Sequence, residues 1–221
     1  MSVNDDRITG AGERATPAVV TSAAPIADPA PLGAAAFALT TFLLSAANAG
    51  WMTKATGDAW LPYALAYGGV IQLLAGMWEF RNKNVFGATL FGSFGGFWIG
   101  LGLYVLLVER VAPASPLLKA AFLAQVPKDL GWILLAFAIF NIYMLLISTQ
   151  VNLTLFVTLL LLEATLIILS IGNFTASTGT IKAGGYVGVA TALAAWYLSA
   201  AGVANGLGSR IKIPVGRSLI S

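Results

Sequence analysis

The acidic side chains in or beside long apolar stretches are the residues of this sequence most able to do chemistry. Glu163 lies near the middle of LTLFVTLLLLEATLIILSIG, and none of the apolar stretches contains a lysine or arginine that could pair with it. An apolar environment favours the neutral form of a carboxyl group, and such groups often carry protons. We therefore take Glu163 as a candidate proton carrier, with a structural hydrogen bond as the alternative. Glu79 lies at the end of its stretch beside Arg81 and Lys83, where we expect an ion pair.

Weakly polar side chains also form stripes along the apolar stretches. Thr41 and Asn48 lie seven positions apart in the first stretch, and Gln72 has Gly68 and Gly76 four positions away on either side in the second. Residues at these spacings share one face of a helix. Polar groups are costly in lipid, so these faces must contact water or protein. They line a narrow conduit or form hydrogen bonds between helices.

The composition places this chain among integral membrane proteins. A soluble domain has about 25% charged residues, whereas this chain of 221 residues is 58% hydrophobic and 10% charged. The absence of histidine and cysteine excludes disulfides, thiolate metal sites and Ser-His nucleophiles. No carboxylates cluster, so we expect no enzyme, no metal and no cofactor. The net charge of +3 is scattered over loops, which argues against nucleic acid as a partner.

The apolar segments predict an all-α integral membrane fold. A bilayer core of about 30 Å requires about 20 apolar residues per helix. Segments of that length lie at 33–52, 60–80, 86–108, 130–149, 152–172 and 183–206. The weakest break is STQVN at 148–152, which is polar but carries no charge. We predict a disordered polar tail over 1–27, a bundle of six transmembrane helices over 28–208 and a short basic tail over 209–221.

The basic residues predict the orientation in the lipid bilayer. An even number of helices places both termini on the same side of the membrane. Arg210, Lys212 and Arg217 directly follow the last apolar segment. Because positive charge accumulates on cytoplasmic loops, we expect cytoplasmic termini and a multi-pass protein of the plasma membrane.

Small and aromatic residues follow a second pattern. Phe94 lies among glycines of the third segment, and Phe37 stands on the stripe of Thr41. Apolar rings at a constriction can gate by excluding water, although dry packing is their commoner use. Small residues at every fourth position allow helices to pack closely, within one subunit or between subunits. Those of the third segment are Ala88, Gly92, Gly96 and Gly100.

Two long motifs resemble a known family. DPAPLGAAAFALTTFLLSAANAG (28–50) resembles the Asn-Pro-Ala-Pro-Leu-Gly signature that opens the first helix of the acetate uptake transporters, also called the GPR1/FUN34/YaaH family. YGGVIQLLAGMWEFRNKNVFGATLFGSFGGFW (67–98) is similar to the second and third helices of that family. SIGN (170–173) falls where the fifth helix ends. The resemblance covers residues 28–206.

The resemblance implies a transport function. Members form six-helix bundles, usually assembled as homohexamers with a separate path through each subunit. They take up acetate and related small carboxylates such as succinate, with a proton. Their constriction contains aromatic residues that fall on Phe37 and Phe94 here, so Thr41, Asn48 and Gln72 would line the route. A passive channel for neutral solutes such as urea or ammonia is the alternative, as is an anion channel without proton coupling.

The motif that opens the first helix also has a physical reading. Pro29 and Pro31 suit a helix start, where a missing N–H has no cost. The motif residues from Asp28 through Leu32 to Gly33 form this helix start. Its unpaired backbone N–H groups can attract a carboxylate. Four features depart from the family pattern: Asp28 replaces an asparagine, Ala34, Ala35 and Ala36 are smaller than usual, Phe94 lacks a tyrosine hydroxyl, and Glu163 replaces a small polar residue.

Overall fold

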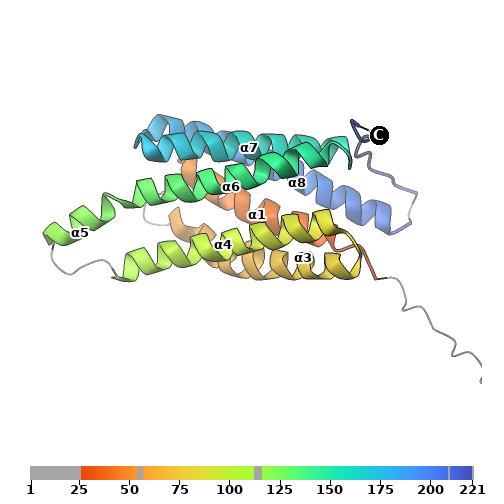
Figure 1. The fold of residues 1–221 in the computed structure, drawn as a ribbon, viewed down its shortest axis with the longest axis horizontal. Coiled ribbons are helices and arrows are strands. Elements are labelled where there is room, and N and C mark those ends of the chain that lie inside the picture. The colour runs from red at the N-terminus through yellow and green to blue at the C-terminus, as the bar shows by residue number, and fades with distance from the viewer. Residues whose placement is uncertain (1–25, 54–56, 112–115, 209, 221) are drawn as a thin grey trace, which may run out of the picture.

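In the computed structural model, residues 26–53, 57–111, 116–208 and 210–220 are described, and their regular structure is helical (Figure 1). The tail predicted over 1–27 lies almost wholly outside these residues. The helices are α1 (Ala30–Asn48), α2 (Leu61–Tyr63), α3 (Gln72–Arg81), α4 (Val85–Val111), α5 (Pro116–Leu123), α6 (Val126–Ser148), α7 (Leu153–Phe174) and α8 (Thr178–Gly206). Around α2 lie a 3-10 turn, η1 (Gly57–Trp60), and a π-helical segment, η2 (Ala64–Ile71).

The six predicted transmembrane segments are present, five of them in continuous helices long and apolar enough to cross a membrane. The remaining segment, the second, combines η1, α2, η2 and α3 in direct succession. Its middle has π-helical geometry, which is rare and often marks functional positions. Several boundaries differ from the prediction, and α6 and α8 begin at Val126 and Thr178 rather than at 130 and 183. Helix α1 starts at Ala30 because the prolines fit its first turn, and residues 116–123 form the short helix α5 within the predicted connection.

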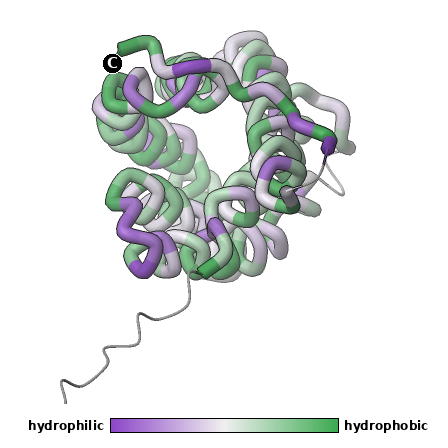
Figure 2. Tube along the Cα trace, turned by 90° about the vertical axis from the view of Figure 1, so that its right-hand side faces the viewer, coloured by the Kyte–Doolittle hydropathy of each residue, from purple (hydrophilic) through white to green (hydrophobic). Residues whose placement is uncertain are grey.

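The helices are arranged as a ring (Figure 2). Around the ring, α6 packs on α7, α7 on α8, α8 on α1, α1 on η2 and α3, and these two on α4. The ring closes weakly between α4 and α6. The inner faces of helices distant in the sequence therefore meet along one axis.

Glycines set the closest approaches between these helices. A Cβ atom added to Gly76 would lie 2.5 Å from the backbone nitrogen of Gly92, so α3 and α4 touch through their backbones. Gly95 packs in the same way against Leu73. Gly96 has no neighbour within 4 Å on its Cβ side among the described residues. The predicted ladder therefore serves packing within the subunit at Gly92, whereas Gly96 lies on an open face.

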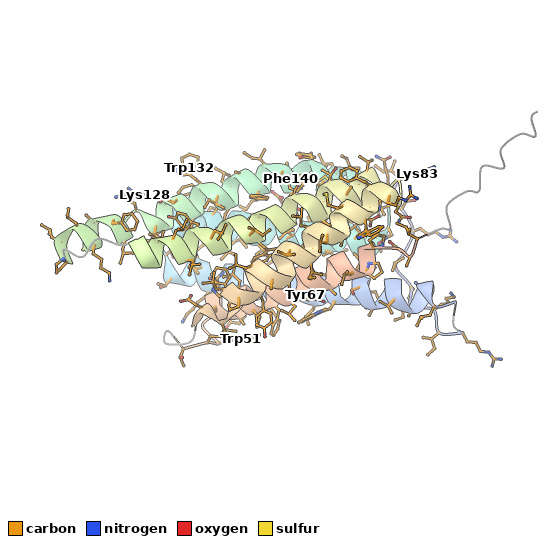
Figure 3. All side chains as sticks on the ribbon, turned by 90° about the horizontal axis from the view of Figure 1, so that it is seen from below. Trp51, Tyr67, Lys83, Lys128, Trp132 and Phe140 are labelled. Atoms are coloured by element: carbon orange, nitrogen blue, oxygen red, sulfur yellow. The ribbon has the colours of Figure 1, made fainter. Side chains whose placement is uncertain are left out.

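The two ends of the bundle differ. Lys83 lies at one end and Lys128 and Trp132 near the other (Figure 3). The described C-terminal segment lies at the Lys83 end, where α1 also begins (Figures 1 and 3). It packs on the bundle there, since the backbone N–H of Thr154 donates to the carbonyl of Val215 at 2.9 Å.

Candidate functional site

A polar vestibule opens at the end of the bundle where α1, α4 and α7 begin. This cavity measures about 340 Å³. Its polar wall comes from five side chains supplied by four separate parts of the chain. They are Asp28, Asn82, Asn84, Asn152 and Asn205.

Three helix starts form part of the vestibule wall. The carboxylate of Asp28 accepts a hydrogen bond from the backbone N–H of Ala30 at 3.0 Å, at the start of α1. The side-chain oxygens of Asn84 and Asn152 accept backbone N–H groups at the starts of α4 and α7. Helix starts carry partial positive charge and favour anions. At these three starts, side-chain oxygens already accept backbone N–H groups, so the vestibule wall is polar and carries the negative charge of Asp28.

The proline-rich motif builds this wall. The carbonyl of Pro29 accepts the N–H groups of Leu32 and Gly33 at 3.1 Å each, so the chain turns directly into α1. Pro31 lines the vestibule, and its carbonyl accepts the hydroxyl of Ser199 on α8 at 2.7 Å. Leu32 is exposed on the outer surface. The motif thus joins α1 to α8 at the mouth.

Gly33 has a separate role, because an aromatic ring occupies the space of a side chain there. A Cβ atom at Gly33 would lie 2.7 Å from the ring of Phe91. Phe91 lines both the vestibule and a small first chamber of about 30 Å³ deeper in the bundle. The missing side chain of Gly33 therefore keeps the ring of Phe91 in the wall of the junction.

A second chamber, also of about 30 Å³, lies beyond the first. Phe37, Phe94 and Leu162 line both chambers and so form the boundary between them. The rings of Phe37 and Phe94 meet edge to face with centroids 5.7 Å apart. Both chambers are much smaller than the vestibule. These three side chains form an apolar constriction.

Phe94 is held in place by other rings. Its centroid lies 5.4 Å from that of Phe140 and 5.8 Å from that of Phe137, both on α6. Its side chain is 2% exposed. Phe94 therefore forms a fixed side of the constriction.

Unpaired polar atoms lie on both sides of the constriction. Gln72 lines the first chamber, and Thr41 and Trp98 line the second. The Oε1 of Gln72, the Oγ1 of Thr41 and the Nε1 of Trp98 are buried without a hydrogen-bond partner in the described part of the chain. A hydroxyl and an indole N–H can both donate to a carboxylate. Asn48, at the end of α1, lines none of the cavities described here.

Glu163 lies outside the path formed by these cavities. Its Oε2 accepts the side-chain amide of Asn141 on α6 at 2.8 Å, and the same amide donates to the carbonyl of Leu159 at 3.0 Å. Its side chain is 7% exposed and lines neither the vestibule nor either chamber. The role of Glu163 as a proton carrier stays a prediction.

Sequence reasoning missed Leu162 and the meeting of Asn82, Asn84 and Asn205 at the vestibule. On α7 it singled out Glu163, whereas the helix lines the chambers with a neighbouring face. That face carries an apolar repeat with spacings of three and four, which was the available signal. Its members are Leu155, Leu159, Leu162, Leu166 and Leu169.

The chain is similar to proteins named for transport. It is 37% identical over 187 residues to ammonia transport outward protein 2 of Saccharomyces cerevisiae, an alignment covering 85% of this chain and 65% of that protein. It is 36% identical over 201 residues to acetate permease A of Emericella nidulans, covering 86% and 65% of the two chains. It is 32% identical over 193 residues to the succinate-acetate/proton symporter SatP of Escherichia coli, covering 87% and 97%.

The fold agrees with these similarities. A solved structure described as the bacterial acetate channel SatP superposes with a TM-score of 0.77 at 29% identity, covering 86% of this chain and 99% of that one. The chain spans 65% of the length of the two fungal relatives. The family model described as GPR1/FUN34/yaaH matches residues 11–217. This chain, an all-helical multi-pass membrane protein, therefore belongs to the GPR1/FUN34/YaaH family.

Proposed function

We propose that this protein carries acetate and related small carboxylates across the plasma membrane together with a proton. The observation that supports this most is the polar vestibule leading to the constriction of Phe37, Phe94 and Leu162. The names of the acetate permease and of the succinate-acetate/proton symporter support the substrate class and the proton. In this proposal the termini are cytoplasmic, and each subunit of a homohexamer has its own path.

The apolar constriction explains why a proton accompanies the anion. Among the residues that the structure describes, no lysine or arginine lines the vestibule or either chamber. An ionised carboxylate entering such a site without a partner loses far more hydration energy than it regains. The substrate therefore passes Phe37 and Phe94 as the neutral acid. On the far side, Thr41 and Trp98 offer hydrogen bonds to it.

Labelled acetate uptake into proteoliposomes, with and without an inward proton gradient, tests this proposal. We expect saturable uptake that the gradient drives above equilibrium. Uptake that only equilibrates would make the protein an acetate channel without coupling. Passage of ammonia without acetate would favour the second candidate, a channel for a neutral solute, which the name of the yeast relative supports.

Asp28 should weaken substrate capture, because its negative charge lines the mouth. We expect Asp28→Asn to lower the KM for acetate about fivefold at low salt, since one unit charge about 4 Å away contributes about 1 kcal/mol in water. Asp58→Asn is the matched control, because Asp58 is an exposed acid outside the vestibule lining. Equal KM values for Asp28→Asn and the unmodified protein would show that this charge does not act on the substrate.

Glu163→Gln tests the predicted proton carrier. Glutamine keeps an oxygen that can accept the amide of Asn141, so the contact between α6 and α7 is retained. Because Glu163 lines none of the cavities described above, we expect the pH profile of acetate uptake to stay unchanged. A displaced profile would instead identify Glu163 as a group on the proton route.

A further inference from the structure

A second acidic side chain, Glu79, is buried close to the vestibule. Its side chain is 0% exposed. The side-chain amide of Asn82 donates to its Oε2 at 3.3 Å, a long hydrogen bond. Its Oε1 makes no hydrogen bond of standard geometry among the residues that the structure describes, and the side-chain amide of Asn84 lies beside the carboxyl group. The ion pair expected with Arg81 or Lys83 is not among the described contacts, and both of these side chains are exposed.

Gly87 separates this carboxyl group from the vestibule. A Cβ atom added to Gly87 would lie 2.8 Å from both Cδ and Oε1 of Glu79. Gly87 itself lines the vestibule, together with Asn82 and Asn84. The unpaired oxygen of Glu79 therefore lies against a wall position that has no side chain. Any residue larger than glycine would meet both the carboxyl group and the amide of Asn84 there, since the Nδ2 of Asn84 would lie 2.6 Å from the added Cβ atom.

The charges around Glu79 make a further anion unfavourable. Asp28, at the entry to α1, carries a negative charge and lines the same vestibule. The start of α4 packs on Glu79 through Gly87, and the neighbouring Asn84 is neutral. Apart from the exposed Arg81 and Lys83 that follow Glu79 in the chain, no cation is placed at this wall in the described ranges. Like charges held close together in a buried site do not both stay ionised.

We propose that Glu79 is the proton-binding residue of the vestibule, taking up a proton when a small carboxylate anion enters. The neutral Glu79 then donates its O–H toward the substrate carboxylate. If this proton moves to the substrate, Glu79 returns to its ionised form and the neutral acid proceeds to the constriction. The inference rests on the proposed function, because it requires a carboxylate substrate.

Binding and proton uptake are linked in this scheme. If acetate raises the proton affinity of Glu79, protonation must raise the affinity for acetate by the same factor. The apparent affinity for acetate therefore rises as the pH falls. Glutamine at position 79 mimics the neutral acid and should bind acetate without taking up a proton.

The test uses the purified full chain in weakly buffered detergent. Labelled acetate, adjusted to the pH of the sample, is added while a pH indicator reports proton uptake and equilibrium dialysis reports binding. We expect the unmodified protein to take up a proton with each acetate bound. We expect Glu79→Gln to bind acetate without proton uptake and with an affinity that no longer depends on pH. Glu79→Asp, which restores a carboxyl group, should recover the uptake, and Asp58→Asn should leave it unchanged.

The outcomes that would contradict the proposal distinguish the role of Glu79 from the transport of acetate. Proton uptake by Glu79→Gln equal to that of the unmodified protein would overturn the role of Glu79 and leave acetate transport standing. Loss of proton uptake in Glu163→Gln, with uptake kept in Glu79→Gln, would move the role to Glu163. Absence of acetate binding by the unmodified protein would overturn the proposed function itself.

Discussion

Replacing Phe37 with alanine is expected to let longer acids pass, raising butyrate uptake relative to acetate about tenfold or more. The estimate follows from the size discrimination of apolar pockets, where each methylene group changes selectivity about 10- to 200-fold. Phe37 lines both small chambers, and its ring meets that of Phe94. Without the Phe37 ring, the two chambers would merge into one wider passage.

The measurement is competition between labelled acetate and butyrate in proteoliposomes. Removal of a buried ring costs about 3–5 kcal/mol of stability, so the folded fraction of each variant is measured first. Phe42→Ala is the matched control on α1, because Phe42 contacts Trp51 and Trp196 rather than the path. An unchanged butyrate-to-acetate ratio in Phe37→Ala would show that this ring does not select by size.

Adding a single methyl group at Gly33 is expected to reduce acetate uptake about 10- to 100-fold. The new Cβ atom would lie 2.7 Å from the ring of Phe91, which is too close for two carbon atoms, so the ring must shift. Overpacking of this kind costs about 1–3 kcal/mol, which corresponds to the expected factor. Phe91 lines the junction between the vestibule and the first chamber, so a displaced ring narrows the entry.

Gly96→Ala is the matched control for Gly33→Ala. It makes the same substitution within a helix, at a position with no neighbour inside 4 Å among the described residues. Alanine favours a helix over glycine by about 1 kcal/mol, so the substitution itself stabilises the helix equally in both variants. Equal uptake by the two variants would contradict the role assigned to Gly33.

The sequence was sufficient to predict the number of membrane segments, because burial in lipid imposes length and apolarity directly. Even the uncharged break at 148–152 was correct, since α6 ends at Ser148 and α7 begins at Leu153. The side chain of Asn152 caps the start of α7 by accepting the N–H of Leu155 at 2.9 Å. Local hydrogen bonding of this kind can be read from residue type.

The inner face of each helix could not be predicted in the same way. On α7, the sequence offers both the carboxyl group of Glu163 and an apolar repeat that includes Leu162 as candidates for the inner face. Which of them faces the centre depends on the position of α6, whose Asn141 pairs with Glu163. The vestibule could not be predicted for the same reason. Its residues Asn84, Asn152 and Asn205 come together only when the helices pack into the ring. The packing of the helices against one another therefore determines which residues face the path.

Cysteine modification at Leu198 tests most directly whether the substrate follows this path. The chain contains no cysteine, so Leu198→Cys introduces a single thiol. Leu198 lines both the vestibule and the first chamber. Leu207→Cys, exposed just beyond the end of α8, is the control.

An anionic methanethiosulfonate would be applied to both variants in proteoliposomes, with and without acetate. We expect modification of Leu198→Cys to abolish acetate uptake, and acetate to slow that modification. Modified Leu207→Cys should keep its uptake. Complete modification of Leu198→Cys with undiminished acetate uptake would contradict a path through the vestibule and the constriction.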